Sequence, residues 1–144
     1  MEGDPLRLWQ HIHGASVHFP IALVFVSFGF DLAAALRRRD SWRAVGFWTW
    51  MIAALLLFPA VGSGLTGQMG WFRVEPWSGG EKLLLHRNLA LIGGGLVEAL
   101  ALVRLVGRDR FRPGVWAGYL FLAALATALI GYTGFLGGYV RLGY

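Results

Sequence analysis

Long apolar runs alternate with short polar tracts along the chain. Four runs are long enough to cross a bilayer: residues 19–36, 44–66, 83–106 and 115–136. A helix needs roughly 20 apolar residues to cross about 30 Å of hydrocarbon, and it satisfies its own backbone hydrogen bonds in lipid. The runs are rich in Leu and Ala and lack turn signals, which argues against strands. The pattern predicts an all-α integral membrane four-helix bundle in a single domain, residues 1–144.

Proline and capping residues predict where some of these helices begin. Ser78-Gly79-Gly80-Glu81 has the spacing of a capping box, so we expect the third helix to begin near Gly79. Asp4-Pro5 resembles an N-cap followed by a first-turn proline, which predicts a short separate helix before the first span. Pro59 lies inside the second run and predicts a kink there.

The basic residues predict the orientation in the membrane. Eight arginines lie in the first and third polar tracts: Arg37, Arg38, Arg39, Arg43, Arg104, Arg108, Arg110 and Arg112. The other side carries five basic residues: Arg7, Arg73, Lys82, Arg87 and Arg141. By the positive-inside rule, both termini are expected outside the cytoplasm of a multi-pass protein of the bacterial inner membrane. The tryptophans, Trp9, Trp71 and Trp77 on the outer side among them, fall near the expected interfaces.

Composition narrows the function classes. Hydrophobic residues make up 56% of the chain and charged residues 15%, below the roughly 25% charge of soluble domains. The net charge of +5 sits in short tracts, which favours membrane orientation over nucleic-acid binding. The absence of Cys excludes disulfides, thiolate metal sites and iron–sulfur clusters on this chain. No hydrolase or nucleotide-binding motif occurs, so we do not expect an enzyme.

An internal repeat predicts that the bundle consists of two similar helical hairpins. The second and fourth runs both end in G-x-T-G-x-x-G, at residues 64–70 and 131–137, which are 67 positions apart. His18 and His86 are 68 positions apart, and Asp31 and Glu98 are 67 apart. A duplicated hairpin implies a pseudo-twofold axis along the membrane normal. This register predicts His18 and His86 at equal depth, near the outer face.

The histidines are the candidate cofactor ligands, because all four lie toward the predicted outer side. Paired imidazoles in a helical bundle are a common way to hold haem iron. We expect His18 and His86 as the iron ligands of haem b, with His13 or His11 as alternates and Arg87 beside a propionate. The alternative is a set of interfacial histidines that bond to carbonyls or headgroups and hold no cofactor.

Asp31 and Glu98 are the acidic residues inside the spans. Such residues are costly in a membrane and are functional candidates by default, here as a proton relay. The alternative is pairing with arginines one or two turns further on, such as Arg38 or Arg104.

The segment His13-Gly-Ala-Ser-Val-His18-Phe19-Pro20-Ile-Ala-Leu resembles the H-P-x-x-V-H-F-P-I-A-L opening of a bacterial membrane family catalogued as domain-of-unknown-function family 2231. Thr66-Gly67, His86 and Gly137-Gly138 also match its pattern, whereas Gly14 stands where the family often has Pro. Family members are sometimes joined to Rieske-type or cytochrome c domains. The resemblance therefore implies redox work at the outer membrane face.

Three functions follow as hypotheses. The first is a small membrane subunit of a redox or energy-converting complex that binds haem b and transfers electrons. Its partners would be the lipid bilayer, other membrane or extracytoplasmic redox proteins, and quinone, with no nucleic acid. The second is a cofactor-free structural accessory subunit of a respiratory or photosynthetic complex. The third is a small transporter or proton channel that uses Asp31 and Glu98.

Overall fold

Four long helices form the protein. The computed structural model describes residues 5–69 and 80–142. The helices are α1 (Pro5–Arg37), α2 (Asp40–Met69), α3 (Gly80–Val106) and α4 (Pro113–Leu142). Within these residues all four are long and apolar enough to cross a membrane. The predicted all-α, four-helix membrane fold is confirmed, and each apolar run lies inside one helix.

The helix starts differ in part from expectation. The prediction of a separate short helix before the first span is wrong, because α1 runs unbroken from Pro5 to Arg37. Proline is tolerated in a first turn, where its missing N–H has no intrahelical partner. α3 begins at Gly80, whose φ of 55° suits glycine. Of the expected capping box, Ser78 and Gly79 lie outside the described residues. The same holds for Trp71, Trp77 and the side chain of Trp9.

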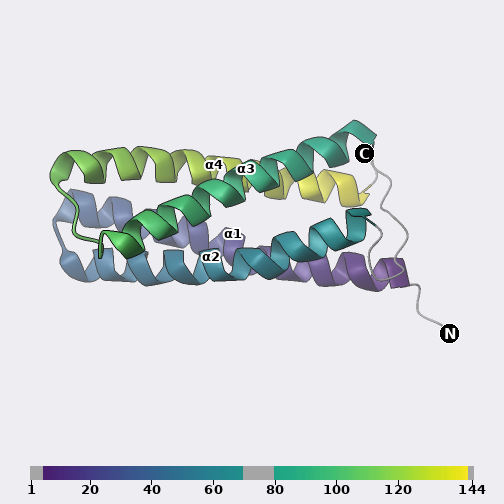
Figure 1. The fold of residues 1–144 in the computed structure, drawn as a ribbon, viewed down its shortest axis with the longest axis horizontal. Coiled ribbons are helices and arrows are strands. Elements are labelled where there is room, and N and C mark those ends of the chain that lie inside the picture. The colour runs from purple at the N-terminus through teal and green to yellow at the C-terminus, as the bar shows by residue number, and fades with distance from the viewer. Residues whose placement is uncertain (1–4, 70–79, 143–144) are drawn as a thin grey trace.

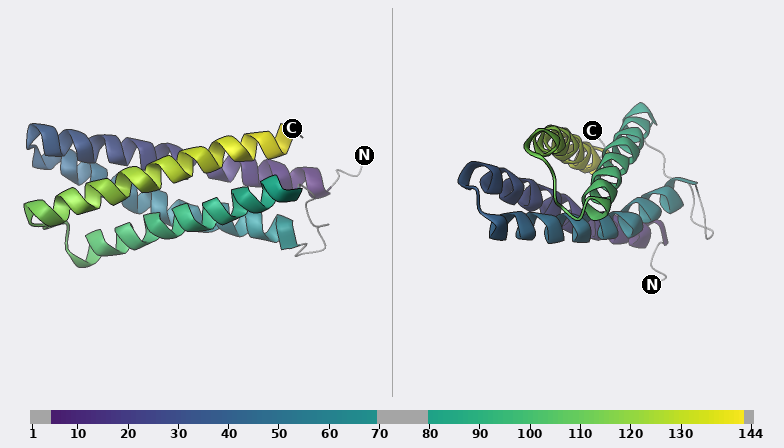
Figure 2. Two further views of the ribbon diagram at one scale, coloured as in Figure 1. Left: turned by 90° about the horizontal axis from the view of Figure 1, so that it is seen from above. Right: turned by 60° about the vertical axis from the view of Figure 1, so that its left-hand side comes forward.

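Two antiparallel hairpins pack against each other to make the bundle (Figures 1 and 2). α1 packs on α2 and α3 packs on α4, while α1 also touches α4 and α2 touches α3. The helices therefore follow the order α1, α2, α3, α4 around the bundle, with α1 diagonal to α3 and α2 diagonal to α4. The start of α1 and the end of α4 lie at the same end of the molecule (Figure 1).

The two ends of the bundle have different chemistry. We call the end that contains residues 37–43 and 104–112 the arginine end, and the opposite end, with His13 and His86, the histidine end. Two short connections close the hairpins at the arginine end, residues 38–39 and 107–112. Arg38, Arg108 and Asp109 adopt positive φ values of 52°, 49° and 53° there, in the left-handed conformation that commonly ends helices.

The hairpins repeat with an offset of 73 residues, so the expected offset of 67 to 68 residues is wrong. Shifting α2 by 73 positions makes it coincide with α4 from end to end. The fully buried pairs Val24/Val97 and Ala53/Ala126 keep the same offset. The glycine motif does not define the offset between the two hairpins, because its glycines recur every third residue. Gly64 can therefore be matched to Gly131 or, as the structure has it, to Gly137.

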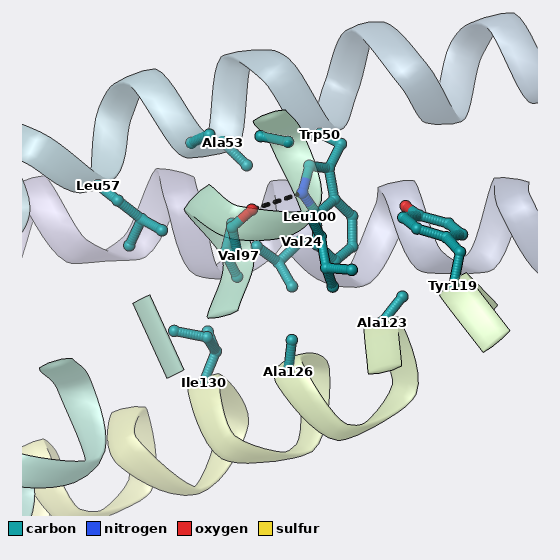
Figure 3. Close-up of a cluster of buried hydrophobic side chains, with 12 residues drawn as sticks. Val24, Trp50, Ala53, Leu57, Val97, Leu100, Tyr119, Ala123, Ala126 and Ile130 are labelled. Carbon is teal, nitrogen blue, oxygen red and sulfur yellow. Dashed lines mark hydrogen bonds between the residues drawn. The ribbon is translucent and has the colours of Figure 1, made fainter. Parts of the chain in front are cut away.

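A tightly packed core fills the middle of the bundle (Figure 3). Trp50 on α2 is fully buried and donates its Nε1–H to the carbonyl of Val97 on α3 at 3.0 Å. Small buried residues on α2 and α4 leave room in the core for the Trp50 side chain and for close packing of each helix on its neighbours. The fully buried ones are Ala53, Ala123 and Ala126.

Trp50→Phe should lower the free energy of unfolding by about 1 kcal/mol, because it removes this interhelical hydrogen bond while keeping an aromatic ring. Trp48→Phe is the matched control, since Trp48 is 64% exposed on the same helix. Unfolding in detergent micelles, followed by circular dichroism, measures both. Equal stability of the two variants would show that the Trp50–Val97 bond does not hold the hairpins together.

Candidate functional site

A buried ion pair joins the two hairpins at the arginine end. Asp31 of α1 and Arg104 of α3 have no exposed side-chain surface, and Arg104 Nη1 lies 2.7 Å from Asp31 Oδ2. The hydroxyl of Tyr119 on α4 donates to the same Oδ2 at 2.8 Å and accepts from Arg104 Nη1 at 3.0 Å. Three groups from three helices thus satisfy one another in a closed triangle.

Asp109 extends this pair into a neutral four-charge network. Arg104 presents its Nε and Nη2 to the two carboxylate oxygens of Asp109, at 2.9 and 3.1 Å. Arg43 of α2 donates its Nε to Asp109 Oδ2 at 3.1 Å and its Nη2 to the Asp109 carbonyl. A fork-to-fork contact of this kind is among the strongest hydrogen-bonding arrangements. Asp31, Asp109, Arg43 and Arg104 therefore balance in charge, and they come from α1, the α3–α4 connection, α2 and α3.

Aromatic rings enclose the two guanidinium groups. Arg43 lies 4.1 Å above the ring of Trp116, which stacks on Tyr119 at 4.9 Å. Arg104 lies 5.0 Å from the centre of Tyr119 and 5.3 Å from that of Phe47. Ring faces attract cations, and this attraction grows when water is excluded. The rings therefore replace part of the hydration that the buried charges lose.

A missing side chain on α2 makes room for the carboxylate of Asp31. A Cβ atom at Gly46 would lie 2.1 Å from Asp31 Oδ1. Ser27 binds the carbonyl of the same Gly46 at 2.5 Å, which fixes α2 against α1. Asp31 Oδ1 has no hydrogen-bond partner within the described residues. The carboxylate is thus held through Oδ2 alone, by Arg104 and Tyr119.

Glu98 lies outside this network. Its side chain is partly exposed on α3, and its Oε1 is buried without a hydrogen-bond partner in the part of the chain that the structure describes. Glu98 and Arg104 are six positions apart on the same helix, so their side chains point in directions that differ by about 240° at 3.6 residues per turn. The expected local pairing of Glu98 with Arg104 is therefore wrong. Asp31 pairs with Arg104 instead, across the bundle.

Arg104→Gln should destabilise the protein by about 3–5 kcal/mol, because it leaves the buried Asp31 without its cation. Asp31→Asn should cost less, because Arg104 keeps Asp109 as a partner. Unfolding free energies in mixed micelles measure both, with Glu98→Gln as the control that breaks no ion pair. An Arg104→Gln variant as stable as Glu98→Gln would contradict a structural role for the network.

Two histidines meet across the bundle at the other end. His13 of α1 and His86 of α3 have ring centres 6.5 Å apart and ring planes at 86° to each other. These residues are 73 positions apart, as are Asp31 and Arg104, so both pairs occupy equivalent places in the two hairpins. One pair of equivalent residues therefore lies close to the pseudo-twofold axis of the bundle at the histidine end, and another at the arginine end.

Backbone carbonyls fix both imidazoles in the same way. His13 Nδ1 lies 3.1 Å from the carbonyl of Ala60, and His86 Nδ1 lies 3.0 Å from that of Thr133. His13 Nδ1 is also 2.9 Å from Ser63 Oγ. A carbonyl only accepts hydrogen bonds, so each Nδ1 carries the proton. Nε2 is then the basic nitrogen of each ring, the tautomer that suits a ligand to a metal.

Glycines bring the neighbouring helices close to both rings. A Cβ at Gly64 would lie 2.9 Å from His13 Cε1, and one at Gly137 would lie 3.0 Å from His86 Cε1. These two glycines are again 73 positions apart. Each hairpin therefore contributes a histidine and a glycine that packs on its ring. The carbonyl that accepts the hydrogen bond from the ring lies four residues before that glycine.

The structure separates the other candidate ligands from this pair. His18, expected opposite His86, is exposed, and its Nδ1 donates to the carbonyl of Gly14 within α1. His11 is exposed on α1 as well. Arg87 lines the cavity next to His86 and donates to Asn88 Oδ1 at 3.1 and 3.2 Å. The two histidines that face each other are His13 and His86.

The spacing of these rings fits two ligands of one ion. A metal–imidazole bond is about 2 Å long and a ring centre lies about 1 Å behind its nitrogen, so ligands on opposite sides of an ion have ring centres about 6 Å apart. Within the described residues no group of three or more His, Asp or Glu side chains could hold a metal. Two ligands alone do not complete a metal site, so the pair would need a cofactor that supplies the remaining ligands itself. The adjacent cavity is only about 50 Å³, much smaller than a porphyrin, so the site would have to widen before it could hold haem.

Most of these residues stand out in the sequence, but their grouping does not. The sequence suggests Arg104 as a local partner of Glu98, and it assigns neither Tyr119 nor Asp109 to a site. The signal that could have found the grouping is the 73-residue offset, which relates His13 to His86 and the opposite charges Asp31 and Arg104.

Comparison with known proteins gives one match. The model of a family described as "Predicted membrane protein (DUF2231)" matches residues 10–144, nearly the whole chain. No curated protein matches the chain. No solved structure matches it either.

Proposed function

The chain belongs to the DUF2231 family of predicted membrane proteins, and we propose that it is a small membrane subunit that binds haem b between His13 and His86 and transfers electrons. The observation that carries this proposal is the crossed histidine pair, with ring centres 6.5 Å apart and both Nδ1 atoms held by carbonyls. His18, preferred from the sequence, is replaced by His13 as the partner of His86.

The protein residues have separate roles in this proposal. His13 and His86 would hold the haem iron through Nε2, and the carbonyls of Ala60 and Thr133 keep each ring in the tautomer that this requires. Arg87 lines the same cavity and would pair with a propionate. When bound, haem supplies reversible one-electron chemistry, whose potential the axial ligands and their hydrogen bonds set.

The proposed orientation rests on the arginines. By the positive-inside rule, the arginine end would lie in the cytoplasm of a bacterium and the histidine end at the outer face of its inner membrane. Haem at that depth would exchange electrons with quinol in the membrane and with an extracytoplasmic redox protein. These 144 residues contain no Cys, so they cannot themselves hold a thiolate-bound iron–sulfur or covalently attached haem centre.

Purified protein expressed with ample haem should show a sharp α-band when dithionite reduces it. His13→Ala and His86→Ala should each abolish the band, because each removes one axial ligand. His18→Ala is the matched control on α1 and should keep the band, since its ring is exposed outside the pair. Loss of the band in His18→Ala but not in His13→Ala would reverse the ligand assignment.

Gly137→Ala should shift the α-band or weaken haem retention, because the new methyl group would press on the His86 ring at 3.0 Å. Gly138→Ala is the adjacent control, where an added Cβ meets nothing within 4 Å. Changes to the groups that pack on or hydrogen-bond to metal ligands commonly alter metal affinity by about 10- to 100-fold. Identical spectra and haem retention for both variants would contradict a packed ring in the site.

A cofactor-free structural subunit is the second candidate, and the small cavity of about 50 Å³ favours it. The histidines would then act as interhelical hydrogen-bond donors within a larger complex. A featureless spectrum together with a marked loss of stability in His13→Ala and His86→Ala would support this function over haem binding. The transporter hypothesis has no comparable support, because Asp31 is fixed by Arg104 and Tyr119.

A further inference from the structure

A second, larger cavity lies at the arginine end. Its volume is about 240 Å³, and it lies between the end of α1, the start of α2 and the start of α4. Arg38, Arg39 and Arg43 form its charged side. Its apolar side includes Ala34, Phe111 and Trp116. The cavity is therefore amphipathic, and it is separate from the histidine pair.

The charges of this cavity are only partly balanced. Arg43 is bound by Asp109, as described above. Arg38 and Arg39 have no ion-pair partner among the residues that the structure describes, and the guanidinium of Arg39 lies 5.7 Å above the ring of Trp42. Asp40 is the acidic residue in the lining and offsets one of these charges. The cavity therefore has a net positive charge, which favours the binding of an anion.

The position of the cavity identifies the kind of anion. The spanning part of α1 ends at Arg37, and those of α2 and α4 begin at Asp40 and Pro113. These limits place the cavity at the depth of lipid headgroups. Leu36 of α1, which is 74% exposed, continues the apolar surface from this level toward the membrane centre. A phosphate beside the arginines would thus be joined to acyl chains along α1.

We propose that this cavity binds the phosphate headgroup of an anionic phospholipid, with Arg38 and Arg39 as its cationic ligands. Guanidinium groups bind phosphate oxygens through paired hydrogen bonds. Basic pockets between membrane helices are suited to headgroup binding. The apolar wall distinguishes a lipid from free phosphate, because an inorganic ion gains nothing from Ala34, Phe111 or Trp116.

Native mass spectrometry of the full chain in detergent, titrated with phosphatidylglycerol or phosphatidylcholine, tests this proposal. The protein should retain phosphatidylglycerol at about tenfold lower concentration than phosphatidylcholine. The double variant Arg38→Gln/Arg39→Gln should lose that preference. The control Arg110→Gln/Arg112→Gln removes the same charge from the same end, outside the cavity, and should keep the preference.

Two further measurements separate the competing explanations. Arg38→Lys/Arg39→Lys should keep much of the preference, which shows that lost binding in the glutamine variant reflects charge and not misfolding. An equal loss in the Arg110/Arg112 control would reduce the effect to general surface charge and overturn the proposal. Displacement of the lipid by millimolar inorganic phosphate would likewise overturn it, because the site would then bind the free ion.

Discussion

The ion pair between Asp31 and Arg104 is the constraint on which the rest of the structure depends. Both side chains are fully buried inside a helical bundle, where an unpaired charge is very costly. The pair joins diagonal helices, so it can form only when the two hairpins have one particular relative register. Asp109, Arg43 and Tyr119 complete it with contributions from the α3–α4 connection, α2 and α4. In a bilayer, where apolar surface does not by itself drive helices together, such polar contacts and close packing select the arrangement of the bundle.

The same register determines the histidine end. Residues 73 positions apart lie in equivalent places on the two hairpins, so a bundle that pairs Asp31 with Arg104 also brings His13 to His86. Between the two ends, Val24 and Val97 are fully buried at the corresponding level, and Trp50 bonds across to α3. The duplication is therefore nearly symmetric in shape but not in chemistry. One pair of equivalent residues carries opposite charges that neutralise each other, while the other pair is identical and presents two like ligands. This difference is why the arginine end contributes to stability, whereas the histidine end is where we propose a cofactor.

Sequence patterns predicted the fold well, because span length and hydropathy are dictated by the bilayer and need no knowledge of neighbours. The site was harder to predict for physical reasons. Glycines that recur every third residue match in several registers, so the motif at Gly64 could not distinguish Gly131 from Gly137. Arg38 lies two turns beyond Asp31 in the sequence, so it was expected to form an ion pair with this aspartate. It lies instead beyond the end of α1 with a φ of 52°, where it no longer follows the helix face. The partner of Asp31 comes from another helix, and only three-dimensional packing reveals it.

The central functional claim is that His13 and His86 hold one iron with their ring planes crossed. Electron paramagnetic resonance of the oxidised, haem-loaded protein tests it most directly, because the low-spin ferric signal depends on the angle between axial imidazoles. Planes at 86° predict a single, strongly anisotropic low-spin signal. A rhombic three-line signal would indicate nearly parallel rings, and a high-spin signal would indicate a single histidine ligand. Either result would contradict the crossed pair as the haem site.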